Sequence, residues 1–69
     1  MSDLQPHQQR VVAEADELAL KVSKLTDFLH APFFDTIPRP EQILLVEQRA
    51  HMKSYLSVLQ ARIAAFGAA

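Results

Sequence analysis

The amino-acid sequence predicts an all-α fold, an antiparallel helical hairpin with a short connecting helical turn. Two long segments carry apolar residues at helical spacing, and the four prolines lie outside the interiors of both segments. The single glycine stands close to the end of the chain, where helices commonly stop. A chain of 69 residues with 49% apolar side chains is expected to form one globular domain spanning residues 1–69.

The first helix is predicted over about residues 6–29. Asp3 is the expected N-cap, and Pro6 suits the first turn, where a missing N–H group costs nothing. Apolar side chains then recur at intervals of four and three residues: Val11, Ala15, Leu18, Val22, Leu25 and Leu29. Because the flanking positions are mostly charged, the pattern indicates an amphipathic helix with one buried face.

An elbow is expected over residues 30–39, followed by a second helix over about residues 40–66. Pro32 disfavours helical geometry at the residue before it, and the apolar residues Phe33, Phe34 and Ile37 predict one short helical turn. Pro40 suits the first position of the second helix. The core-facing stripe of that helix is predicted to be Leu45, Arg49, Met52, Leu56, Leu59, Ile63 and Phe66.

The second helix is apolar on more than one side. Residues 43–46 (ILLV) cover more than one face, and a second line runs beside the core stripe through Leu44, Gln48, Tyr55, Val58 and Arg62. Two helices of roughly 36–40 Å enclose little interior, and small chains without disulfides usually need oligomerisation. We therefore expect a compact homo-oligomer. The alternative is a self-sufficient monomer that uses Phe33 and Phe34 to close its core.

Several classes of function are disfavoured by composition. The absence of cysteine excludes disulfides and cysteine-based zinc sites, and three widely spaced histidines predict no metal site. We expect no cofactor and, without a nucleophile–base pair, no enzymatic activity. A net charge of −1 argues against duplex nucleic acid as a partner. No apolar run is long enough to span a membrane, and the first residues lack the features of a secretion signal.

The cationic side chains are the most informative polar groups. Arg10, Lys21 and Lys24 lie along the rim of the first apolar stripe. Arg62 stands among apolar residues, where its planar donor fork can bind either a carboxylate of a neighbouring subunit or a phosphate. His7 is placed to stack on a nucleobase, or it is simply an exposed residue of the first turn. Periodicity alone thus predicts an oligomeric hairpin with cationic rims.

Three segments together resemble the small phage-encoded anti-CBASS cyclic-nucleotide sponges: residues 6–12 (PHQQRVV), 17–25 (ELALKVSKL) and 60–66 (QARIAAF). The middle of the chain, residues 33–38 (FFDTIP), adds to this resemblance. It implies a homohexamer of interlocked helical hairpins that sequesters cyclic dinucleotides such as cyclic GMP-AMP without cleaving them. Some members also bind cyclic trinucleotides at separate sites. The expected location is the cytoplasm of the phage-infected bacterial host.

The resemblance also implies roles for particular residues. Lys21 matches a phosphate-binding lysine, with Lys24 beside it on the same rim. Ser23 and Arg62 match positions of a second, trinucleotide-type site, which His7 joins. Pro6, His7 and Gln8 stand where the family often carries an aromatic residue that stacks on a base. Loss of stacking worth roughly 1–3 kcal/mol per base predicts weaker dinucleotide binding. The candidate set is Pro6, His7, Gln8, Lys21, Ser23, Lys24 and Arg62.

Two other functions remain open at this stage. One is a helical protein-interaction module that docks on a host or phage protein through the apolar residues 43–46. The other is a sponge for cyclic ADP-ribose signals, because the sponges share their hairpin with phage proteins that antagonise Thoeris defence and bind such isomers.

Overall fold

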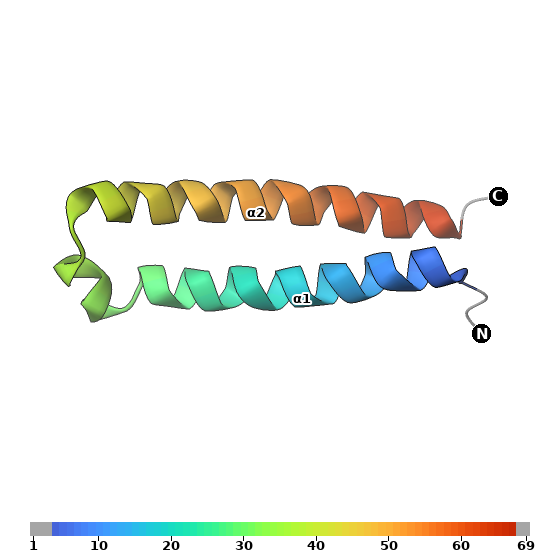
Figure 1. Cartoon of the computed structure of the whole chain (residues 1–69), viewed down its shortest axis with the longest axis horizontal. Helices are drawn as coiled ribbons and strands as arrows, with labels where there is room; N and C mark the ends of the chain where they lie inside the picture. The colour runs from blue at the N-terminus through green and yellow to red at the C-terminus, as the bar shows by residue number, and fades with distance from the viewer. Residues whose placement is uncertain (1–3, 68–69) are drawn as a thin grey trace.

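The protein is a hairpin of two long antiparallel helices that lie side by side (Figure 1). The computed structural model describes residues 4–67, with α1 at Pro6–Leu29, a 3₁₀ helix η1 at Pro32–Thr36, and α2 at Arg39–Phe66. The predicted all-helical hairpin with a helical elbow is confirmed. The hairpin measures 49 × 16 × 15 Å, and its radius of gyration of 15.6 Å exceeds the roughly 11 Å of a compact chain of this length.

The start of α1 is held by glutamine side chains. Gln5 is the N-cap, and its backbone N–H donates to Oε1 of Gln8 over 2.9 Å. The side chain of Gln9 donates to the carbonyl of Leu4, also over 2.9 Å. The predicted cap Asp3 lies outside the described residues. Both bounds of α1 are as predicted.

The core is a thin seam between the two helices. Among the described residues four side chains are buried, Val11, Ala15 and Leu18 from α1 and Leu59 from α2. Leu59 is 1% exposed and is the most buried of the four. Partly buried apolar residues extend the seam in both directions: Val22, Met52, Leu56, Ile63 and Phe66. Within residues 4–67 the interior is therefore a single row of side chains, as expected for two helices without a third layer.

The elbow closes one end of the seam. Ala31 is extended (φ −80°, ψ 146°), the conformation that a following proline favours. The ring of Phe28 lies 6.2 Å from those of Phe33 and Phe34 between centroids, a spacing at which tilted aromatic pairs attract. The amide nitrogen of Gln42 donates to the carbonyl of Phe34 over 3.0 Å, and to that of a second elbow residue over 2.8 Å. These contacts tie η1 to α2.

The second helix starts one residue earlier than the sequence predicted. Its N-cap is Pro38, whose carbonyl accepts hydrogen bonds from the backbone N–H groups of Glu41 and Gln42 over 3.0 and 3.1 Å. Arg39 is thus the first helical residue and Pro40 the second. Both positions lack an acceptor for their own N–H group within the helix, so a proline is tolerated at either.

Within residues 4–67, one side-chain hydrogen bond joins the two long helices and shows how they are aligned. Nε of Arg49 donates to Oγ1 of Thr26 over 2.7 Å. Arg49 was predicted in the core-facing stripe, and it is half-buried there. The same alignment brings Leu59 against Ala15. Residues whose numbers sum to about 75 therefore face each other across the hairpin.

Candidate functional site

The predicted site residues occupy three places on the hairpin. Pro6, His7 and Gln8 form the first turn of α1, at the open end. Lys21, Ser23 and Lys24 lie in the second half of α1, and Arg62 lies near the end of α2. All of them are exposed except Gln8, which is half-buried. Their side chains are therefore accessible to a ligand or to another copy of the chain.

The middle group divides between two faces of α1. A helix turns about 100° per residue, so Lys21 and Ser23 point to opposite flanks, whereas Lys21 and Lys24 lie on the same side. A ligand phosphate held by the two lysines would thus approach α1 from a different direction than a ligand held by Ser23.

Arg62 does not meet Ser23 within one chain. By the alignment of the helices, Arg62 is level with about Ala13, and Ser23 lies about ten residues further along α1, or roughly 15 Å. His7 lies nearer to Arg62, roughly 9 Å along the axis by the same arithmetic. A site that combines Arg62 with Ser23 therefore needs residues from more than one copy of the chain.

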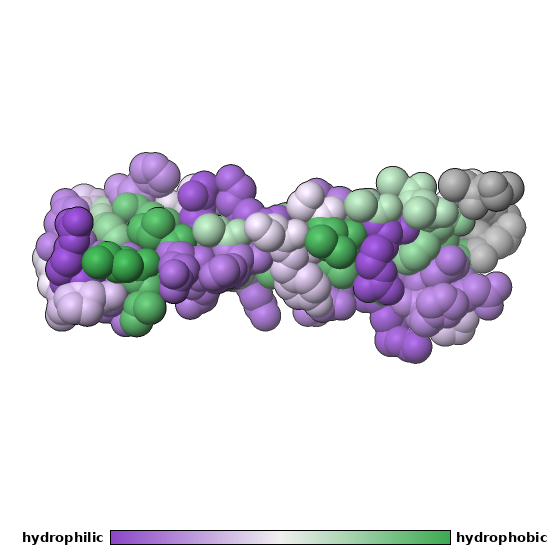
Figure 2. Space-filling model, turned by 90° about the horizontal axis from the view of Figure 1, so that it is seen from above, coloured by the Kyte–Doolittle hydropathy of each residue, from purple (hydrophilic) through white to green (hydrophobic). Residues whose placement is uncertain are grey.

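The outward side of α2 carries most of the exposed apolar surface. Among residues 4–67, five of the seven large apolar side chains that are exposed belong to this helix: Ile43, Leu44, Val46, Tyr55 and Val58. The view onto α2 shows apolar surface gathered toward the elbow end, with further patches along the helix between polar side chains (Figure 2). By helical geometry Leu44, Tyr55 and Val58 lie on one flank of α2, and Ile43 and Val46 lie on the other.

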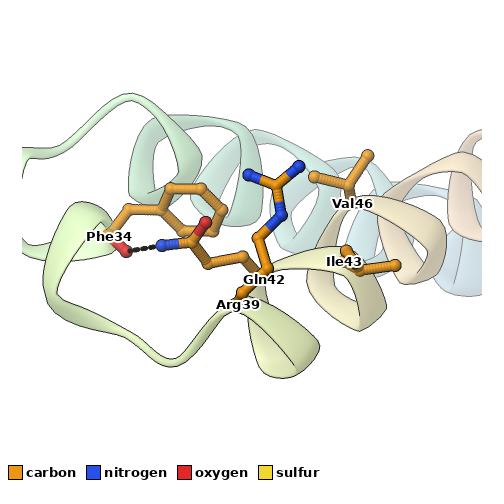
Figure 3. Close-up of a pocket in the computed structure, with 5 residues that line it drawn as sticks. All are labelled: Phe34, Arg39, Gln42, Ile43 and Val46. Carbon is orange, nitrogen blue, oxygen red and sulfur yellow. Dashed lines mark hydrogen bonds between the residues drawn. The ribbon is translucent and has the colours of Figure 1, made fainter.

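A pocket of about 290 Å³ lies where the elbow meets the second of these flanks. It is lined by Phe34 of η1 and by Arg39, Gln42, Ile43 and Val46 of α2 (Figure 3). The guanidinium of Arg39 extends along the pocket toward Val46. We call these five residues the elbow pocket. Ligand sites for small molecules typically hold about 300–1,000 Å³, so this volume suits a side chain better than a cyclic dinucleotide.

Sequence reasoning missed two residues of the elbow pocket. Arg39 was not among the candidates, although an arginine between two prolines at the start of a helix is a recognisable signal of a fixed position. Gln42 was overlooked because nothing in the sequence shows that its amide turns back to two elbow carbonyls. Neither residue belongs to the set that the family resemblance implies.

Among residues 4–67, no three histidine or acidic side chains converge on a point where they could hold a metal ion. Neither long helix has an apolar stretch sufficient to cross a bilayer.

Comparison with known proteins gives a family for this hairpin. The family model described as Sequestin matches residues 5–65, which include both helices and the elbow almost entirely. The chain belongs to the Sequestin family. A relative in Enterobacteria phage T4, described as an uncharacterized 7.5 kDa protein in the denB–rIIB intergenic region, is 45% identical over 60 residues. These residues cover 87% of this Sequestin and 94% of the phage protein. No solved structure matches the chain.

Proposed function

We propose that this Sequestin sequesters cyclic oligonucleotide immune signals, and that it does so without converting them. The observation that carries the proposal is the family match over residues 5–65, together with a phage relative that spans nearly the same length. In this proposal the protein acts in the cytoplasm of an infected bacterium. It binds cyclic dinucleotides such as cyclic GMP-AMP, and also cyclic trinucleotides, before they activate the CBASS effector.

The arrangement of the cationic residues supports binding between copies. Lys21 and Lys24 share an accessible side of α1, while Arg62 lies on α2 near the open end. A cyclic dinucleotide has two phosphates, and a two-fold symmetric oligomer offers each of them the same lysine. The elbow pocket of one chain is small for such a ligand, which also favours a site shared between copies. We propose a homohexamer as the assembly that forms these sites.

The proposal is tested by calorimetry against a panel of cyclic di- and trinucleotides. Lys21→Ala should weaken dinucleotide binding and spare trinucleotide binding, whereas Arg62→Ala should do the reverse. Each variant loses a charge-assisted contact with phosphate, worth roughly 1.5–3 kcal/mol or about 10- to 150-fold in affinity. Lys53→Ala removes an exposed lysine of α2 outside the candidate set, so it is the matched control and should bind as the wild type does.

Equal losses of both ligands in Lys21→Ala and Arg62→Ala, with the assembly intact, would mean one shared site. Absence of binding to every cyclic oligonucleotide in the panel would refute the proposal, and binding of cyclic ADP-ribose isomers alone would replace its ligand class. The bound ligand should also be recovered intact by chromatography after the protein is digested. Linear products would identify an enzyme instead of a sponge.

A docking module remains the second candidate, and one observation favours it. Ile43, Leu44 and Val46 are each more than half exposed at the elbow end of α2, where they leave a considerable apolar surface open to a partner. If the protein is a docking module, a charged substitution at Val46 should weaken its binding to the host or phage protein. Calorimetry should then detect no binding of the wild-type protein to the cyclic oligonucleotides of the panel.

A further inference from the structure

The elbow pocket combines apolar walls with one cationic group. Phe34, Ile43 and Val46 form the walls, and the guanidinium of Arg39 lies along them (Figure 3). Among the five residues drawn, the one hydrogen bond joins Gln42 to Phe34 and leaves the guanidinium unbonded. An occupant that matches this chemistry has an apolar tip with a carboxylate beside it.

The opposite helix carries a side chain of that kind. Leu20 is 62% exposed, and it is the one exposed large apolar side chain of α1 within the described residues. Asp16 and Glu17 precede it by four and three residues and Lys24 follows it by four, so two carboxylates and one ammonium group lie next to it on the helix surface. Leu20 points away from the seam that holds Leu18, so this chain cannot bury it by itself.

We propose that Leu20 of one copy inserts into the elbow pocket of a second copy, with Asp16 and Glu17 beside Arg39. The charges of the chain support this occupant. Within the helices themselves, α1 carries four acidic and three basic side chains, whereas α2 carries two acidic and four basic ones, so their net charges are of opposite sign. Leu20, the apolar tip, and the elbow pocket belong to the same chain, and both are accessible on a single hairpin.

The tip and the pocket are different surfaces, so two copies can exchange the contact reciprocally about a two-fold axis, or each copy can pass it to the next in a ring. Both arrangements are compatible with a hexamer that contains two-fold axes. The inference extends the assembly invoked in the proposed function, but it concerns contacts that form without a nucleotide.

Crosslinking tests the contact directly, because the chain contains no cysteine. We would prepare Leu20→Cys and Val46→Cys separately, mix them in equal amounts, and add a short bifunctional maleimide. The expected product is a covalent dimer that contains one chain of each variant, with little dimer from either variant alone. Val58→Cys is the matched control, because Val58 is 57% exposed, as against 51% for Val46, and lies on the other flank of α2. Its mixture with Leu20→Cys should give at least five-fold less dimer.

Charge reversal tests the ionic part of the same contact. Arg39→Glu in the Val46→Cys chain should lower the yield several-fold, and Glu17→Lys in the Leu20→Cys chain should restore it. The circular dichroism of each variant should match the wild type, because every substituted residue is exposed. No mixed dimer, or equal yields with Val46→Cys and Val58→Cys, would overturn the proposal.

Two further outcomes would assign the pocket to another occupant. If a cyclic oligonucleotide alone protects Val46→Cys from maleimide, the pocket is a ligand site and the proposal is wrong. If a different protein is required for protection, the pocket is a docking site for that protein and the proposal is again wrong. The crosslinking mixtures themselves contain no nucleotide, so absence of the mixed dimer does not decide whether the protein binds a nucleotide. Calorimetry measures that binding separately.

Discussion

Replacement of Leu59 by alanine should remove a large part of the stability of the hairpin. Leu59 is 1% exposed and packs against Val11, Ala15 and Leu18, so its loss leaves a cavity at the centre of the seam. Buried Leu→Ala changes cost about 2.7–5.0 kcal/mol. A seam one side chain thick can partly collapse, so we expect about 3 kcal/mol, near the lower end of that range.

The free energy lost in Leu59→Ala is large relative to the total free energy of unfolding. At about 0.05–0.15 kcal/mol per residue, a chain of this size is stable by roughly 3.5–10 kcal/mol. Urea unfolding followed by circular dichroism measures the change, and repeating it at two protein concentrations separates folding from association. Gln60→Ala, at the exposed neighbouring position, should change the free energy of unfolding by less than about 0.5 kcal/mol. If Leu59→Ala cost less than about 1 kcal/mol, Leu59 would not lie at the centre of the core.

The side-chain hydrogen bonds of Arg49 and Gln42 give further expectations. Thr26→Val should lower the free energy of unfolding by about 1–3 kcal/mol, because it leaves Nε of the half-buried Arg49 without its acceptor. Thr26→Ser keeps the hydroxyl and should retain most of the stability, and urea unfolding compares the two variants. Gln42→Leu should increase hydrogen exchange across residues 32–37 while the centres of both long helices keep their protection, because it frees the carbonyls of Phe34 and Ile37. Uniform exchange along the whole chain would contradict this local role.

Most of the fold was predictable because helical periodicity and proline position act locally. The stripe through Val11, Ala15 and Leu18 predicted the buried face of α1, and Pro32 predicted the extended residue before the elbow. α2 begins at Arg39, next to the expected start at about residue 40, since either of its first two positions accepts a proline. The interhelical bond from Arg49 to Thr26 was beyond sequence reasoning, because a 3.6-residue period does not show how two helices slide along each other.

The candidate site was harder to predict than the fold. The sequence identified Lys21 and Arg62 as exposed cations, and both are exposed. It could not show that Ser23 and Arg62 are separated along the hairpin, because that distance depends on the alignment of the helices. It also missed Arg39, whose significance comes from the apolar walls that the elbow places beside it. A residue whose role depends on a contact across the elbow is not revealed by the apolar periodicity of its helix.

The hydrogen bonds of Gln42 bear on the order in which the hairpin forms. They join Gln42 to Phe34 and Ile37, residues close to it in the chain, so the loop that must close is short and the entropy of closing it is small. Contacts farther from the elbow join residues with ever larger separations, up to the open end that carries His7 and Arg62. The helices are thus expected to zip together from the elbow outward. The first turn of α1, which carries His7 beyond the buried Val11, would then be the last part to form and the first to fray.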